Sequence, residues 1–170
     1  MLFNSYIFIF VFLPITLLVF YYFGGQNHQQ RALVWIVTAS LFFYGWWNPA
    51  YLGLMLFSIL FNYTIGIILS QEHAKHIKTR AILALGIVLN LGLLGYFKYA
   101  NFFVDSVNSA FGTHWYLDKI ILPLAISFFT FQQIAYLVDA YRGLTREYNF
   151  LHYCLFVTFF PQLIAGPIVH

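Results

Sequence analysis

The sequence predicts an all-α fold: a polytopic transmembrane helical bundle of about five to six membrane segments, of which the last is broken. Hydrophobic residues make up 62% of the 170 residues and charged residues only 8%, which is too few charges for the surface of a water-soluble domain. Apolar runs close to the roughly 20 residues that a spanning helix needs recur along the chain. The loops between them are short, so residues 1–170 form one membrane-embedded domain without a separate soluble one.

The first three spans are separated by proline and glycine signals. Pro14 is a tolerated kink within the first span, and Gly24-Gly25 ends it. The aromatic residues at 44–47 end the second span, as such clusters do at the headgroup level. Asn48-Pro49 makes a very short turn, so the third span should run back beside the second. These spans are predicted over residues 6–23, 32–47 and 51–70.

Polar stretches separate the remaining segments. Residues 71–80 precede the fourth span, and a mixed region at 98–119, which contains Asp105 and His114, is expected to lie along the membrane interface. Pro161 divides the last apolar segment, which could therefore cross the membrane or re-enter it. The later segments are predicted over residues 81–97, 120–138 and 150–169.

The basic residues of the loops predict the orientation. If every segment crosses, six basic residues lie on one side and two on the other, and the richer side is expected to be cytoplasmic. The N-terminus is then extracytoplasmic. The six are Arg31, Lys75, Lys78, Arg80, Arg142 and Arg146, and the two are Lys98 and Lys119.

Amides within the spans are the candidate polar groups. Asn62 and Asn90 stand alone in apolar helices, where hydrogen bonding between helices is favoured over a ligand role. Gln132-Gln133 differs because adjacent residues point about 100° apart on a helix, so both amides can hardly share one small contact. With Ser127 and Thr130 they form a polar stripe. It could line a polar passage or serve as a hydrogen-bonded helix interface, and these two interpretations have equal weight.

The end of the last segment is also a candidate. Pro161, Gln162, Gly166 and Pro167 interrupt an otherwise apolar run. A broken helix at membrane depth persists only where protein or a water-filled cavity satisfies the freed backbone groups. We therefore expect Gln162 to lie on the wall of a site, together with Ser127, Thr130, Gln132 and Gln133.

Local motifs define no complete active site, and no catalytic residue is assigned. His73 and His76 are spaced i, i+3, but no third ligand accompanies them, so no metal site is predicted. Cys154 is the single cysteine, which excludes a disulfide framework. The net charge of +3 is small and scattered, so no nucleic acid partner is expected.

Several stretches, taken in order, resemble the membrane-bound O-acyltransferase family, in particular its bacterial alginate O-acetylase-like branch. Any one of them is weak, but the ordered set is specific and covers essentially the whole chain. The stretches lie at residues 1–8, 42–47 (FFYGWW), 95–102 (GYFKYANF), 122–132 (LPLAISFFTFQ), 136–143 (YLVDAYRG) and 160–168 (FPQLIAGPI).

The resemblance implies an enzyme of the bacterial inner membrane that transfers acyl groups, usually acetyl, to hydroxyls of an extracytoplasmic polysaccharide such as alginate. It implies that this chain is the N-terminal part of a larger fold surrounding a funnel, and that the catalytic histidine lies beyond residue 170, so that the chain alone is inactive. No cofactor is bound; the implied acyl donor is acetyl-coenzyme A or an acyl carrier. The implied partners are the lipid bilayer, the polysaccharide acceptor and other O-acetylation proteins.

Two other classes stay open. A transporter or channel also contains broken helices and buried amides, but no motif here is repeated, and no charge lies well inside a span. A non-catalytic membrane scaffold subunit would equally lack catalytic residues. An open reading frame beyond codon 170 with more spans and an intramembrane histidine would favour the enzyme.

Overall fold

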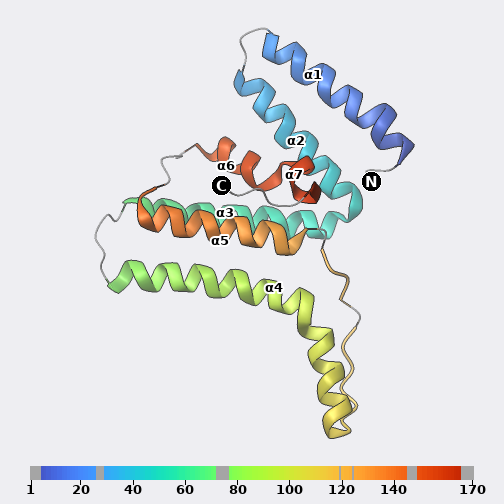
Figure 1. Ribbon diagram of the computed structural model, residues 1–170, viewed down its shortest axis with the longest axis vertical. Coiled ribbons are helices and arrows are strands. Elements are labelled where there is room, and N and C mark those ends of the chain that lie inside the picture. The colour runs from blue at the N-terminus through green and yellow to red at the C-terminus, as the bar shows by residue number, and fades with distance from the viewer. Residues whose placement is uncertain are drawn as a thin grey trace. The chain divides into compact units, whose positions relative to one another are not determined.

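The structure is a computed structural model that describes residues 5–25, 29–71, 77–118, 120–123, 125–144 and 149–165. Every regular element within those residues is a helix (Figure 1), as the sequence predicted. The chain divides into two compact units, Met1–Thr64 with Arg146–His170, and Ile65–Thr145. Each unit is described on its own below.

The first unit opens with a π-helix, η1 (Phe8–Phe12), that continues into α1 (Leu13–Gly25). The Leu13 N–H donates to Phe8 O, five residues back. In a regular α-helix the ring of Pro14 would clash with the carbonyl of Phe10, four residues before it, and would remove the bond to that carbonyl. The wider π-turn before the proline accommodates the ring, so the predicted first span is one helical element with a local change of winding.

Helix α2 (Gln29–Trp47) packs along α1, and the two run in opposite directions (Figure 1). The short helices α6 (Phe150–Thr158) and α7 (Phe160–Ala165) return from the far end of the sequence to pack on α2. Helix α2 is therefore the element on which α1, α6 and α7 all pack.

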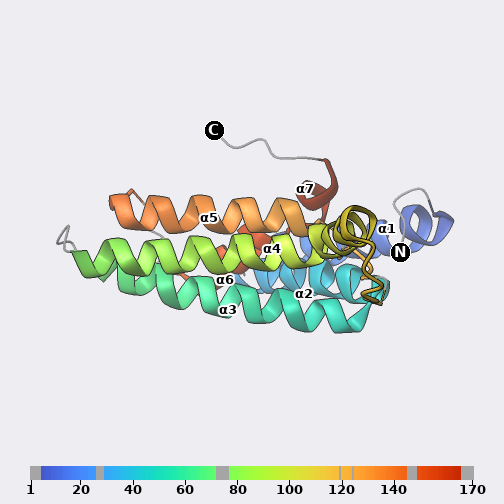
Figure 2. The same cartoon turned by 90° about the horizontal axis from the view of Figure 1, so that it is seen from below.

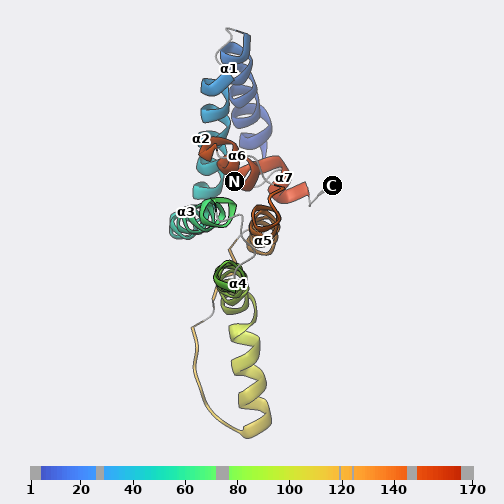
Figure 3. The same ribbon diagram turned by 90° about the vertical axis from the view of Figure 1, so that its left-hand side faces the viewer.

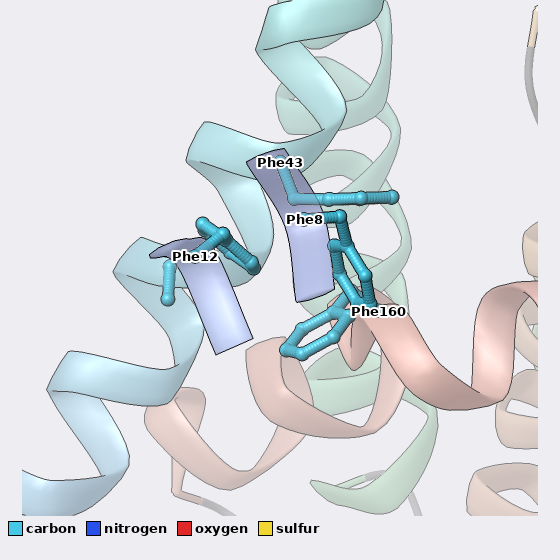
Figure 4. Packing of buried hydrophobic residues seen from close by; sticks show 5 residues of the cluster. Phe8, Phe12, Phe43 and Phe160 are labelled. Carbon is cyan, nitrogen blue, oxygen red and sulfur yellow. The ribbon is translucent and has the colours of Figure 1, made fainter. Parts of the chain in front are cut away.

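The core of the first unit is aromatic. The rings of Phe8, Phe12, Phe43 and Phe160 face one another, with centroid separations of 5.5 to 6.1 Å (Figure 4). Each ring is at least nine-tenths buried. Buried aromatic pairs contribute roughly 0.5–1.5 kcal/mol beyond the area that they bury, so this cluster ties η1 and α2 to the first residue of α7.

Helix α3 (Pro49–Gln71) follows α2 after the single residue Asn48. The Asn48 side chain accepts a hydrogen bond from the Ala50 N–H at 2.9 Å, and Pro49 occupies the first helical position, where no N–H is needed. The short turn predicted from Asn48-Pro49 is confirmed. Residues up to Thr64 belong to the first unit and residues from Ile65 to the second.

The second unit contains the end of α3, the 35-residue helix α4 (Ile77–Phe111) and α5 (Ile126–Arg142). Helices α4 and α5 lie side by side and antiparallel (Figures 1 and 2). Helix α4 continues past Phe97, where the fourth span was predicted to end, and it bends within its length (Figure 1). The end of the span there and the interfacial position of residues 98–119 stay predictions. No proline or glycine occurs between residues 98 and 111, and the helix ends only where Gly112 takes φ +64°.

By length and apolar composition, three described helical stretches could cross a bilayer: Phe8–Gly25, Pro49–Ser70 and Lys78–Phe111. The protein is therefore a membrane protein, in agreement with the composition. Helices α2 and α5 have 19 and 17 residues, and α6 has nine. Their crossing of the bilayer stays a prediction.

Candidate functional site

The candidate site in the second unit is built on α5. This helix begins at Ile126, not at residue 120 as predicted, so residues 120–123 lie outside it. Pro123 cannot donate a helical hydrogen bond, and Ala125 takes the left-handed conformation with φ 58°. A left-handed alanine costs on the order of 1–2 kcal/mol, so the packing of this helix start must hold it in place.

Three of the four polar residues predicted on α5 are buried. Thr130 and Gln132 are each 1% exposed and Gln133 is 0% exposed. Ser127 is exposed. At about 100° per residue, Ser127 lies roughly 120° around the helix from Gln133. Ser127 therefore lies off the buried face, and the polar stripe consists of Thr130, Gln132 and Gln133, which are all buried but spread across about 160° of the helix.

Helix α5 lies beside α4 (Figure 3), and one glycine on each of α3 and α4 lets it approach these helices closely. The Tyr136 ring lies against Gly66 of α3, in the space that a Cβ atom would occupy. The Leu137 Cδ1 atom lies 2.8 Å from where a Cβ of Gly86 in α4 would be. Both α5 side chains come from the turn that follows the polar stripe. The stripe thus lies one turn from two close approaches between α5 and its neighbours.

The Thr130 hydroxyl is the distinctive polar group of the stripe. Thr16, Thr38, Thr64 and Thr158 each donate to the carbonyl four residues earlier, at 2.7–2.8 Å. The Thr130 hydroxyl is buried but has no hydrogen-bond partner among the described residues. Buried polar groups are nearly always satisfied. A water, another part of the protein or a bound molecule is therefore required at this position.

The broken segment of the first unit forms the second part of the candidate site. Helix α6 ends at Thr158, Phe159 takes ψ 104°, and α7 begins at Phe160. The break lies just before Pro161, which falls in the first turn of α7, where its missing N–H costs nothing. The freed N–H of Phe160 donates to the buried Ser40 hydroxyl of α2 at 3.4 Å. Protein therefore satisfies the break, as a broken helix at membrane depth requires.

Gln162 lies in α7 and is partly buried. Its backbone N–H donates to Phe159 O at 3.1 Å, which closes the first turn of α7. It belongs to the first unit, whereas Ser127, Thr130, Gln132 and Gln133 belong to the second. Their shared role as one passage stays a prediction, and Gly166 and Pro167 lie outside the described residues.

The isolated asparagines bond within their own helices. The Asn62 amide donates to Ser58 O at 2.9 Å, and the Asn90 amide donates to Gly86 O at 2.8 Å. Such bonds keep a buried amide satisfied inside an apolar helix. Hydrogen bonding of Asn62 and Asn90 between helices, which the sequence favoured, stays a prediction.

The described histidines do not form a site. His114 and His152 are exposed, and the other four, His28, His73, His76 and His170, lie outside the described residues. Within the described part of the chain, no group of three histidine, cysteine, aspartate or glutamate side chains could hold a metal ion.

Known proteins resemble this chain over its whole length. A peptidoglycan O-acetyltransferase of Helicobacter pylori is 44% identical over an alignment that covers 100% of this chain. A probable alginate O-acetylase, AlgI, of Pseudomonas aeruginosa is 43% identical over 99% of the chain. The protein of the same description from Azotobacter vinelandii is 41% identical over 99% of it.

The chain spans only about a third of the length of these relatives: 37% of the Helicobacter protein, 33% of the Pseudomonas protein and 34% of the Azotobacter protein. No family model matches the sequence, and no solved structure matches it. The similarity to named proteins therefore rests on these alignments.

Proposed function

We propose that this chain belongs to the alginate O-acetylase-like branch of the membrane-bound O-acyltransferase family and is part of an enzyme that acetylates a polysaccharide. The observation that carries the proposal is the 44% and 43% identity, over the full chain, to proteins named as O-acetyltransferases. The resemblance predicted from the ordered sequence stretches is thereby confirmed.

The acceptor is a hydroxyl of an extracytoplasmic polysaccharide. The relatives are named for two different acceptors, peptidoglycan and alginate. Both names describe O-acetylation, so acetyl transfer to a sugar hydroxyl is the chemistry that they share. The donor is acetyl-coenzyme A or an acyl carrier, and other proteins of polysaccharide O-acetylation are the expected partners.

In the reaction, a general base removes the proton of the sugar hydroxyl while its oxygen attacks the acetyl carbonyl carbon. The bond from the acetyl group to the donor breaks, and the donor leaves with the electron pair and takes up a proton. A neutral buried histidine suits the role of base. The family resemblance, which assigns none of the six histidines of this chain to the catalytic motif, places the base beyond residue 170. The 170-residue chain alone should be inactive.

This chain supplies walls of the acyl passage. Buried amides and hydroxyls, at Thr130, Gln132 and Gln133, can hydrogen-bond the polar end of an acyl donor, and Gln162 is a candidate beside the helix break. Surrounding protein keeps bulk water from the activated acyl group. The enzyme is placed in the bacterial inner membrane with its N-terminus extracytoplasmic, as the basic residues of the loops predict.

The experiment uses the complete gene in a bacterium from which the native copy has been deleted. Gln133→Leu should lower the O-acetyl content of the purified polysaccharide, measured by NMR, with the protein still present in the membrane fraction. Ser127→Ala is the matched control, because Ser127 lies on the same helix but is exposed. An unchanged acetyl content in the Gln133→Leu strain would contradict the role of Gln133 in the acyl passage. If the wild-type gene does not restore acetylation of the polysaccharide in the deletion strain, the acetyltransferase proposal itself is contradicted.

A further inference from the structure

A hollow of about 440 Å³ lies between η1–α1 and α2, wholly within the first unit. Its lining residues come from both of these antiparallel helices, so the hollow runs along the line where the two helices pack. Its lining residues are Ile7, Val11, Phe12, Ile15, Thr16, Trp35, Thr38, Ala39, Phe42 and Trp46.

The floor of this groove is made of small residues and its walls of large ones. Thr16 and Ala39 are buried at the bottom, at 6% and 5% exposure. Ile7, Val11 and Ile15 recur every four residues and so form one wall along a single face of the first helix. Phe42 and Trp46 form the facing wall on α2. The groove exists because a threonine and an alanine stand where larger side chains would fill the space.

Every polar side chain that lines the groove is already satisfied by protein. The Thr16 hydroxyl donates to Phe12 O at 2.7 Å, and the Thr38 hydroxyl donates to Val34 O at 2.8 Å. The Trp35 Nε1–H donates to Thr16 O at 3.1 Å. The groove therefore offers an occupant hydrocarbon contact and no free donor. A sugar, a nucleotide or a peptide backbone would leave its own polar groups unsatisfied there.

We infer that this groove binds one hydrocarbon chain of a bilayer phospholipid. Apolar cavities stay free of water, and empty ones forfeit dispersion contacts. The groove's volume of about 440 Å³ is many times the roughly 30 Å³ that one water molecule occupies in the liquid, so a chain of several methylene groups has room there. From Trp35 to Trp46 the groove runs for about 16 Å at 1.5 Å per residue. Both dimensions suit a single acyl chain.

The surroundings of the groove favour lipid as the source of that chain. The walls continue into exposed apolar residues of the same helix, such as Phe10 at 70% and Leu18 at 69% exposure, and this helix is long and apolar enough to cross a bilayer. Trp46 stands at one end, beside the polar turn at Asn48, where a tryptophan suits the headgroup level. A chain could enter there with its headgroup left in the interface. This groove shares no residue with the proposed acyl passage, and the inference does not depend on the proposed acetyl transfer.

The test compares two matched threonines in the protein expressed from its complete gene. Thr38 and Thr64 are both exposed, and each donates to the carbonyl four residues earlier at 2.8 Å, but only Thr38 lines the groove. The protein is exchanged from vesicles of phosphatidylethanolamine and phosphatidylglycerol into detergent, and native mass spectrometry counts the phospholipids that stay bound. We expect the wild type and Thr64→Phe to retain a phospholipid. Thr38→Phe should lower that retention about tenfold, the factor that about 1.4 kcal/mol produces.

A photoreactive amino acid in place of Thr38 identifies the occupant directly in the vesicles. An adduct with the mass of a phospholipid supports the inference, even where Thr38→Phe folds poorly. A cross-link to another peptide of the protein would overturn it, because a protein segment would then cover the groove. Equal lipid retention in Thr38→Phe and Thr64→Phe, or no retained lipid in the wild type, would overturn it as well.

Discussion

Gly66 lets α3 and α5 approach closely because it has no side chain where the Tyr136 ring lies. Substitution Gly66→Ala places a methyl group where the Tyr136 ring lies, and overpacking of this kind costs typically 1–3 kcal/mol. We expect a clear loss of stability in the purified protein, measured as a lower thermal midpoint in detergent.

Gly92 is the matched control for this substitution. It lies in helix α4 of the same unit, and an added Cβ there meets nothing within 4 Å. Because alanine is favoured over glycine in a helix by roughly 0.5–1 kcal/mol, Gly92→Ala should raise the midpoint slightly. Shifts of the thermal midpoint in opposite directions for the two substitutions would identify the contact of Gly66 with Tyr136 as the cause. Equal shifts would contradict it.

The Thr130 hydroxyl can be separated from the Thr130 methyl group by substitution with valine. Thr130 and Thr158 are equally buried at 1% exposure, but only the Thr158 hydroxyl has a partner, Cys154 O at 2.7 Å. Thr158→Val should therefore cost about 1 kcal/mol. Thr130→Val should be neutral or stabilising in the unfolding midpoint and should lower polysaccharide acetylation. A loss of stability as large as that of Thr158→Val would show that the Thr130 hydroxyl is satisfied within the protein.

At the scale of elements, the break between α6 and α7 depends on the bond from Phe160 N–H to the Ser40 hydroxyl. Ser40→Ala leaves that N–H buried and unsatisfied, which costs roughly 1–3 kcal/mol; the long distance of 3.4 Å places the expected loss at the lower end. Thermal unfolding measures it. Ser106→Ala, which removes an exposed hydroxyl bonded within α4, should change stability by less than about 0.5 kcal/mol. A Ser40→Ala protein as stable as Ser106→Ala would contradict the role given to Ser40.

The turn after α4 is organised by one side chain, Asn108. Its Oδ1 accepts from the Thr113 hydroxyl at 2.8 Å and from the Trp115 N–H at 2.9 Å, and its Nδ2 donates to Trp115 O at 2.7 Å. Asn108→Ala should expose the Trp115 amide and accelerate its hydrogen exchange by about tenfold, the factor expected from about 1.4 kcal/mol. Asn108→Asp keeps both acceptor bonds and should give a smaller acceleration. Equal exchange rates in all three proteins would contradict this organisation.

The positions of the helices could be predicted from the sequence, but their ends depended on backbone details. Apolar runs and the Asn48-Pro49 turn predicted the cores of η1–α1, α2, α3, α4 and α5. The sequence ended the fourth span at Phe97 because polar residues such as Asp105 follow it, but the helix itself runs on to Phe111 because no glycine or proline before Gly112 breaks its backbone pattern. The start of α5 was missed because the left-handed Ala125 leaves no mark in residue type.

The candidate site was predicted only as far as helical geometry allowed. Gln132, Gln133 and Thr130 are buried as a stripe, but Ser127 rotates onto the exposed face. The hydrogen bond between Phe160 and Ser40 and the close contact of Gly66 with Tyr136 both join residues far apart in the sequence. Such contacts follow from tertiary packing, and no local pattern of residues indicates them.

At the scale of the whole molecule, the predicted orientation in the membrane can be tested on α4 and α5 of the second unit. Because α4 and α5 are antiparallel (Figures 1 and 2) and Gly86 meets Leu137, Arg80 and Arg142 lie at the same end of the pair. Lys98 lies more than four helical turns further along α4 at 3.6 residues per turn. Two basic residues thus share one end, as the predicted cytoplasmic side requires.

Single cysteines placed at the two ends should therefore react from opposite sides of the membrane. In a Cys154→Ser background of the complete protein, with any other cysteines removed, we expect a membrane-impermeant thiol reagent to label Ser109→Cys in intact spheroplasts. It should label Leu144→Cys only after the membrane is permeabilised, because cytoplasmic loops carry the excess of arginine and lysine. Both positions are exposed, so accessibility in the protein is matched. The reverse pattern would invert the orientation and place the N-terminus in the cytoplasm, if the three preceding segments all cross. Labelling of both positions from outside would mean that α5 (Ile126–Arg142), which lies between them, does not carry the chain across the membrane.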